Sequence, residues 1–144
     1  MITENYVSFE TAKLLKEKGF NAEIDTYYSP EGEFKIWCPN GLKSYLSNEG
    51  TETWWWKCIA PAQSMAMKWL REVHHIHTEI CLYKTSEDDI EPKKSRKAPY
   101  YTFGVWNSVS GDNVDKRLTN DFIGDTYEVA CEAAIKYCLE NIIK

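Results

Sequence analysis

The feature of this sequence that most constrains its fold is a change of hydrophobic period near residue 75. From Pro61 to Val73 the apolar residues recur every three or four positions, which is typical of a helix with one buried face. From Ile76 to Tyr83 apolar and polar residues alternate, which is typical of a half-buried strand. A helix followed so closely by a strand predicts a fold that packs helices against a sheet.

Capping residues place the ends of three helices. Ser8 is expected to cap a first helix that ends before Gly19, and Pro61 is expected at the first position of the second helix. The last helix is expected to begin at Asp125, because D-T-Y-E is a capping-box pattern that places Glu128 at the third helical position. The residues expected on the three apolar faces are Phe9, Ala12, Leu14, Leu15, Ala62, Met65, Ala66, Trp69, Leu70, Val73, Tyr127, Cys131, Ala134, Ile135, Cys138, Leu139 and Ile142.

Two hairpins and one further strand are expected between these helices. Alternating residues over 24–28 and 34–38 flank a Pro-Glu-Gly turn, and residues 54–59 fit a third strand, whereas 40–53 have no clear pattern. The second hairpin joins 76–83 to 100–106 through a charged loop at 84–98. We therefore predict one α+β domain over residues 1–144, with the order α-β-β-(β)-α-β-β-α. Its three helices are expected to cover one face of a single antiparallel sheet of about four or five strands, in two layers.

Charge and hydropathy argue against two classes of partner. The chain has 17 basic and 22 acidic residues, a net charge of -5, so we do not expect general binding to phosphate backbones. A weak nucleic-acid-binding module remains an alternative, because the chain has a run of four basic residues. An acidic cluster precedes this run and offsets its charge. The four basic residues are Lys93, Lys94, Arg96 and Lys97. No apolar run approaches the ~20 residues that span a bilayer, so no membrane partner is expected.

The cysteines favour a reducing compartment. There are five, an odd number, with no C-x-x-C pair, and the N-terminal residues lack a signal-peptide pattern. We therefore expect a cytoplasmic protein whose cysteines serve as small core residues. Cys131 and Cys138, two helical turns apart, are expected on one buried face.

Three residues near the start of the second hairpin are candidates for chemistry. On a strand, His75, His77 and Glu79 would share one face and could ligate a metal or act as acid and base. A zinc site draws further ligands from elsewhere in the chain, and the sequence shows no second cluster. We therefore expect solvent-facing histidines and no cofactor, and keep a metal-dependent or acid–base enzyme as the alternative.

Three consecutive tryptophans, Trp54, Trp55 and Trp56, are the candidates for binding. Alternation would direct Trp54 and Trp56 to one face and Trp55 to the other, so at least one is expected to be exposed. Core packing explains buried aromatics, whereas exposed ones mark contact sites. An aromatic outer face that also includes Tyr27, Trp37, Tyr83 and Trp106 would favour protein–protein contacts, with an unknown protein or by self-association.

Two segments carry a resemblance to known proteins. A-P-A-Q-S-M-A-M-K-W-L-R-E-V-H-H-I-H-T-E-I over 60–80 and T-Y-E-V-A-C-E-A-A-I-K-Y-C-L over 126–139 resemble a family of small uncharacterised proteins from phage-derived and other mobile regions in the genomes of gut anaerobes. K-W-L-R-E-V-H is the most specific part. The resemblance implies an accessory cytoplasmic protein, and it brings no activity or catalytic residues with it.

Overall fold

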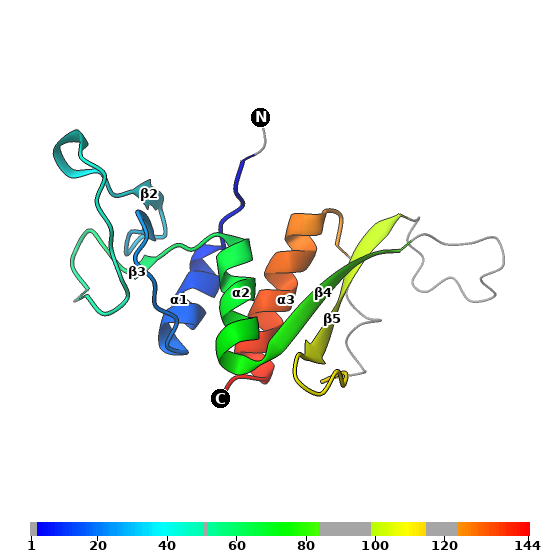
Figure 1. Cartoon of the computed structure of the whole chain (residues 1–144). Helices are drawn as coiled ribbons and strands as arrows, with labels where there is room; N and C mark the ends of the chain where they lie inside the picture. The colour runs from blue at the N-terminus through cyan, green and yellow to red at the C-terminus, as the bar shows by residue number, and fades with distance from the viewer. Residues whose placement is uncertain (1–2, 51, 84–98, 115–123) are drawn as a thin grey trace.

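The computed structural model describes residues 3–50, 52–83, 99–114 and 124–144. Within these residues the chain has an α+β fold with three α-helices, as the sequence predicts (Figure 1). The elements in chain order are α1 (Phe9–Glu17), β1 (Thr26–Tyr28), β2 (Phe34–Ile36), the 3-10 turn η1 (Pro39–Gly41), β3 (Cys58–Ile59), α2 (Gln63–His74), β4 (Ile76–Tyr83), β5 (Tyr100–Asn107) and α3 (Tyr127–Asn141).

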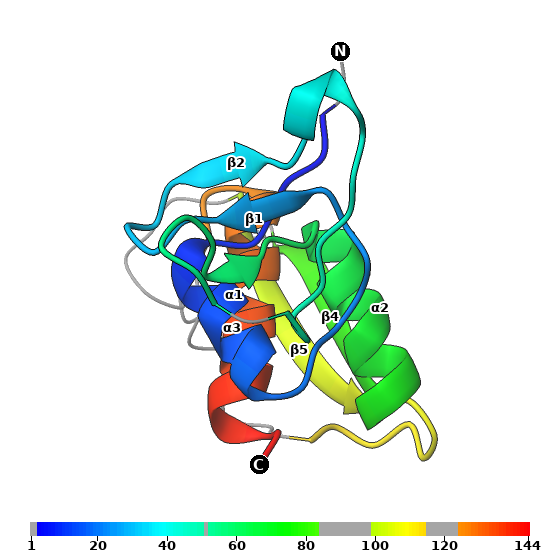
Figure 2. The ribbon, with the colours of Figure 1, turned by 90° about the vertical axis from the view of Figure 1, so that its left-hand side faces the viewer.

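The described strands form two separate antiparallel sheets, so the prediction of one sheet in two layers is wrong. The first sheet has the order β2-β1-β3, and the second consists of β4 and β5. The helices lie between the sheets: α1 packs on β3, α2 packs on β4, and α3 packs on both β4 and β5 (Figures 1 and 2). The sheets are separate because α2 directly follows β3 and leads the chain to the far side of the helices.

The two hairpins are confirmed, and the third strand is shorter than predicted. Thr26 pairs with Ile36 and Tyr28 with Phe34 in the first hairpin, and Ile76 pairs with Asn107 in the second. Only Cys58–Ile59 of the expected strand 54–59 pairs, with β1. The predicted loop 84–98 lies outside the described residues.

The helix starts agree with the sequence at α1 and differ at α2 and α3. The Ser8 hydroxyl accepts a hydrogen bond from the Thr11 N–H at 3.2 Å, as a cap should. The cap of α2 is Ala62, so Pro61 is not its first residue. Pro61 instead lies in extended chain, where its carbonyl accepts a hydrogen bond from the Val7 N–H at 3.0 Å.

The cap of α3 lies one residue later than predicted. Thr126 occupies the cap position, and its hydroxyl accepts a hydrogen bond from the Val129 N–H at 3.1 Å. Asp125 therefore precedes the cap, and Glu128 occupies the second helical position. The reason is that D-T offers two adjacent capping side chains, and the sequence pattern alone does not distinguish them.

One cluster of buried apolar residues connects both sheets with the helices. Leu15 of α1, Ile59 of β3, Leu70 of α2, Phe103 of β5 and Leu139 of α3 all belong to it. Cys131 and Cys138 are buried on the inner face of α3, as predicted. The inner face of α2 is narrower than predicted, because Met65 and Val73 are exposed.

Candidate functional site

The three tryptophans of 54–56 lie in three different environments. Trp54 is 86% exposed, Trp55 is partly buried, and Trp56 is only 2% exposed. The predicted alternation, which would place Trp54 and Trp56 on one face, is wrong because these residues do not form a strand. Only Trp54 is therefore free to contact a partner with its whole ring.

Trp55 belongs to an aromatic cluster on the outer face of the first sheet. Its ring stacks on Trp37, with centroids 4.6 Å apart and planes 12° apart. Tyr27 of β1 meets both rings edge-on, with centroids 5.6 Å from Trp55 and 6.4 Å from Trp37. We call Tyr27, Trp37 and Trp55 the aromatic platform. Tyr27 and Trp37 share this face, as predicted, but Tyr27 is only 6% exposed because the two tryptophan rings pack against it.

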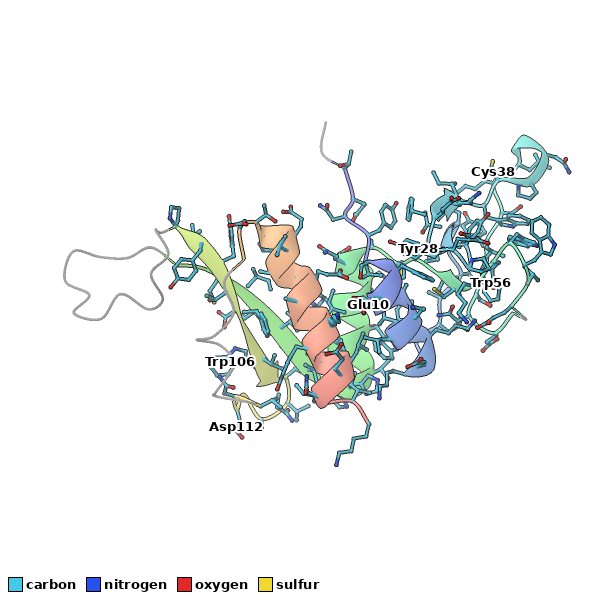
Figure 3. The ribbon with its side chains drawn as sticks, turned by 180° about the vertical axis from the view of Figure 1, so that it is seen from behind. Glu10, Tyr28, Cys38, Trp56, Trp106 and Asp112 are labelled. Atoms are coloured by element: carbon cyan, nitrogen blue, oxygen red, sulfur yellow. The ribbon has the colours of Figure 1, made fainter. Side chains whose placement is uncertain are left out.

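Trp56 faces inward and is part of the packing. The ammonium group of Lys16 lies 4.5 Å from the centroid of its ring. The same ammonium group donates to the Lys57 carbonyl at 2.7 Å and to Glu52 at 2.9 Å. Trp56 therefore fixes the base of the loop from which Trp54 projects, and Figure 3 shows it at the same end of the molecule as Tyr28 and Cys38.

Ion pairs hold the rest of this loop. Glu52 accepts hydrogen bonds from both Lys16 and Lys57, at 2.9 and 3.0 Å. These hydrogen bonds lower the pKa of the Glu52 carboxyl below its ordinary value. The backbone that carries Trp54 is thus tied to α1 and to the residue before β3.

The histidines do not form a shared site with Glu79. His75 ends α2 in the left-handed conformation (φ 56°) and lies outside β4, so the prediction that it shares a strand face with His77 is wrong. The reason is that α2 extends to His74. His77 and Glu79 are exposed on the outer face of β4. Among the described residues, no group of three or more His, Cys, Asp or Glu could hold a metal ion.

His74 is a packing residue. Its ring meets Trp69 edge-on with centroids 4.5 Å apart. Burial, with a smaller contribution from the charge of His75, lowers the pKa of His74 below its ordinary value. The structure thus favours a neutral imidazole at this position.

Two surface hollows lie near the helix ends and do not bring the candidate segments together. One, of about 290 Å³, lies by the first turns of α2 and α3 and includes Ser64, Glu128 and Cys131. Burial raises the pKa of the Cys131 thiol, which keeps it protonated and weakly nucleophilic. The other, of about 310 Å³, includes His74 and His75 but none of the three tryptophans.

A larger groove of about 560 Å³ lies between the first sheet and α2. Its lining includes Tyr6, Ile24 and Thr26 on one side and Met65 and Lys68 on the other. It contains none of the candidate binding or metal-ligating residues, which are Trp54, Trp55, Trp56, His75, His77 and Glu79. Figure 1 shows the first sheet and the β4–β5 hairpin at opposite sides of the helices, so the tryptophan and histidine segments do not converge.

Apart from Trp54, the exposed apolar residues of the first sheet and its connections were not predicted. They are Tyr6, Phe34, Ile36, Leu42 and Tyr45. In the sequence, Phe34 and Ile36 are the apolar residues of the alternating segment 34–38. They are exposed because β2 lies at the edge of the sheet, and hydrophobic period does not report which strand is at an edge.

The basic residues Lys93, Lys94, Arg96 and Lys97 lie outside the described residues. Within the part of the chain that the structure describes, no helix has the length and apolar character needed to cross a bilayer. Comparison with protein-family models, with curated proteins and with solved structures returned no match.

Proposed function

We propose that this chain is a small accessory protein without enzymatic activity, which binds another protein through Trp54 and the adjacent aromatic platform. The observation that carries the proposal is the 86% exposure of Trp54 on a loop whose neighbouring residues are firmly held. Tryptophan is enriched among the residues that dominate binding energy at protein interfaces. Leaving its large apolar ring in water forgoes roughly 2–3 kcal/mol of burial energy, which a partner's pocket can recover.

The loop reduces the entropic cost of binding through this ring. Trp55 is stacked on Trp37, and Trp56 is buried beneath Lys16, so the two residues that follow Trp54 are already ordered. Ordering a flexible side chain or loop costs roughly 0.5–1.5 kcal/mol per side chain at an interface. An anchor on ordered backbone avoids much of this cost.

Charge narrows the chemistry of the partner. Residues 20–59, which include the first sheet and the loop that carries Trp54, contain six acidic and three basic side chains. A partner that presents an apolar pocket bordered by basic residues is complementary to this surface. The resemblance to proteins of phage-derived regions agrees with an accessory role, and that origin and the cytoplasmic location stay predictions.

The test is to select ligands and then remove the anchor. A random peptide library is panned against the immobilised protein, and the affinity of enriched peptides is measured for wild type, Trp54→Ala and Val109→Ala. Val109 is a matched control, because it is also highly exposed but lies after β5, beyond the first sheet. Since a hot-spot tryptophan contributes about 2 kcal/mol or more, we expect Trp54→Ala to weaken binding by at least about 10-fold.

The control variant should bind as wild type does, and both variants should keep the wild-type melting temperature. Enrichment of peptides that Trp54→Ala binds equally well would refute the proposal. A failure to enrich any peptide would also count against it.

A further inference from the structure

Among the described residues, β2 is an edge strand of the first sheet and has a strand neighbour on one side only, which is β1. Trp37 donates its N–H to Asp25, and Ser29 donates its N–H to Glu33, which identifies the hydrogen-bonded positions of the β1–β2 ladder. These positions alternate along an antiparallel pair. The N–H and C=O groups of Phe34 and Ile36 therefore point away from β1, toward the open side. Figure 2 shows β2 on the far side of β1 from the helices.

The side chains of this edge are apolar on one face and charged on the other. Phe34 and Ile36 share the face of Tyr28 and are exposed, Ile36 to 65%. Glu33 and Lys35 share the opposite face, where the Lys35 ammonium lies 3.6 Å from a Glu33 carboxylate oxygen. Both charged side chains are exposed to solvent and available to a neighbouring strand.

The short sequence Glu33-Phe34-Lys35 is complementary to itself when it is read in the opposite direction. Two copies that run antiparallel, with Phe34 opposite Phe34, place Glu33 of each copy opposite Lys35 of the other. In this register the two phenylalanines form a hydrogen-bonded pair, and the charged residues form non-hydrogen-bonded pairs, whose side chains lie closest.

From this complementarity we propose that a second copy of this chain pairs with β2 and extends the first sheet across a two-fold axis. The adjacent registers are disfavoured by charge. In one adjacent register Lys35 of one copy lies opposite Lys35 of the other. In the other adjacent register Glu33 lies opposite Glu33. Like charges directly opposite each other destabilise strand pairs. The charges therefore favour pairing with a second copy through Phe34–Phe34 over the two adjacent registers.

This self-association goes beyond the proposed function, because it uses residues of β2 and not Trp54. Phe34 also contacts Tyr6, with ring centroids 4.8 Å apart, so two aromatic residues from each copy lie at the joint. A strand of three residues buries little area, and stable interfaces bury roughly 1,600 Å² in total. We therefore expect a reversible dimer whose population depends on concentration and falls with added salt.

The test uses charge reversal. One reversal creates like-charged pairs between two identical copies, whereas two opposite reversals in different copies restore oppositely charged pairs. Glu33→Lys and Lys35→Glu are each examined by sedimentation velocity at low ionic strength, alone and in an equimolar mixture. Each variant alone places two like-charged pairs in the dimer, and we expect its dissociation constant to rise about 10-fold or more. The mixture should regain dimers, because the two variants are complementary.

The matched control reverses an exposed ion pair elsewhere. Lys68→Glu and Glu72→Lys alter the same charges on α2, where the two side chains form a 3.9 Å pair. These variants should dimerise as wild type does, whether alone or mixed. A wild type that stays monomeric at every concentration, or a mixture that does not regain dimers, overturns the proposal, as does equal behaviour of the control pair.

Trp54→Ala separates this proposal from the proposed function. The variant should dimerise as wild type does even if peptide binding is lost. Loss of dimers in Trp54→Ala would contradict the β2 pairing, and peptide binding without dimers would leave the proposed function intact. An unrelated extended peptide that pairs with β2 more tightly than the chain itself would also refute the choice of occupant.

Discussion

Replacing Trp56 by alanine measures how firmly the Trp54 loop is held. Trp56 is 2% exposed and packs beneath the Lys16 ammonium. Truncation of a buried Trp to Ala costs about 3–5 kcal/mol, and loss of the cation–π contact adds about 0.5–1 kcal/mol. In the opposite direction, the indole N–H has no acceptor among the described residues, and removing a buried unpaired donor returns about 1–3 kcal/mol. The balance is a loss of about 3 kcal/mol.

Thermal and urea denaturation check this value. For a domain of this size, about 3 kcal/mol lowers the melting temperature by roughly 10 °C. Trp56→Phe keeps an aromatic ring and removes the unpaired N–H, so we expect it to lose much less stability than Trp56→Ala. The exposed Trp54→Ala should stay within about 0.5 kcal/mol of wild type. A Trp56→Ala variant within about 1 kcal/mol of wild type would refute the reasoning, because it would show that this indole does not support the loop.

Two further predictions concern pH and helix capping. The pKa of His74 in the folded chain lies below the ordinary histidine value of 6.5. Near pH 6.5 the unfolded chain therefore binds a proton at this residue more readily than the folded chain does. The free energy of unfolding should therefore fall as pH drops through that value, and His74→Phe should flatten this part of a urea-denaturation pH series; an unchanged slope would contradict it. Thr126→Ala should destabilise the protein by about 1 kcal/mol because it removes the cap of α3, whereas Asp125→Ala should leave the stability nearly unchanged. Thermal melts in which Asp125→Ala is the more destabilising variant would show that Asp125 caps the helix, as the sequence pattern predicts.

The helices and hairpins are predictable from sequence because local patterns determine them. Ser8 caps α1 through a bond to a residue three positions away, and the faces of Leu15 and Leu139 follow from helical spacing. The start of α2 is not local. It depends on the Gln63 N–H, which donates to the Asn5 carbonyl at 2.8 Å and so aligns the N-terminal segment with the residues before the helix.

The division into two sheets also lies beyond hydrophobic period. Alternation identifies a strand and its buried face, but it does not say which strand pairs with which. β1 pairs with β2 and β3, and the β4–β5 hairpin lies across the helices from them. Three contiguous tryptophans illustrate the same limit, since ion pairs and ring stacking outside their own segment decide that one is exposed and one is buried.

The candidate site was identified in part. The sequence correctly placed Tyr27 and Trp37 on one side of the hairpin, because alternation gives both the same side, but it did not show that Tyr27 is buried there. It also selected His75 and His77 as a pair, which the left-handed end of α2 separates. Helix ends are uncertain by one or two residues in sequence patterns, and here that difference decides whether two histidines share a face.

The two proposed contacts depend on one common support. All three residues of β2 are exposed, so this strand gains little from burial in the monomer. What holds it is its backbone pairing with β1 together with Trp37, which follows it, donates to Asp25 at 2.6 Å and stacks on Trp55. Trp55 directly follows Trp54, so this stack also orders the backbone beside Trp54. The aromatic platform therefore explains why an exposed edge strand and an exposed tryptophan occur together in one small sheet: the same stacked pair orders both.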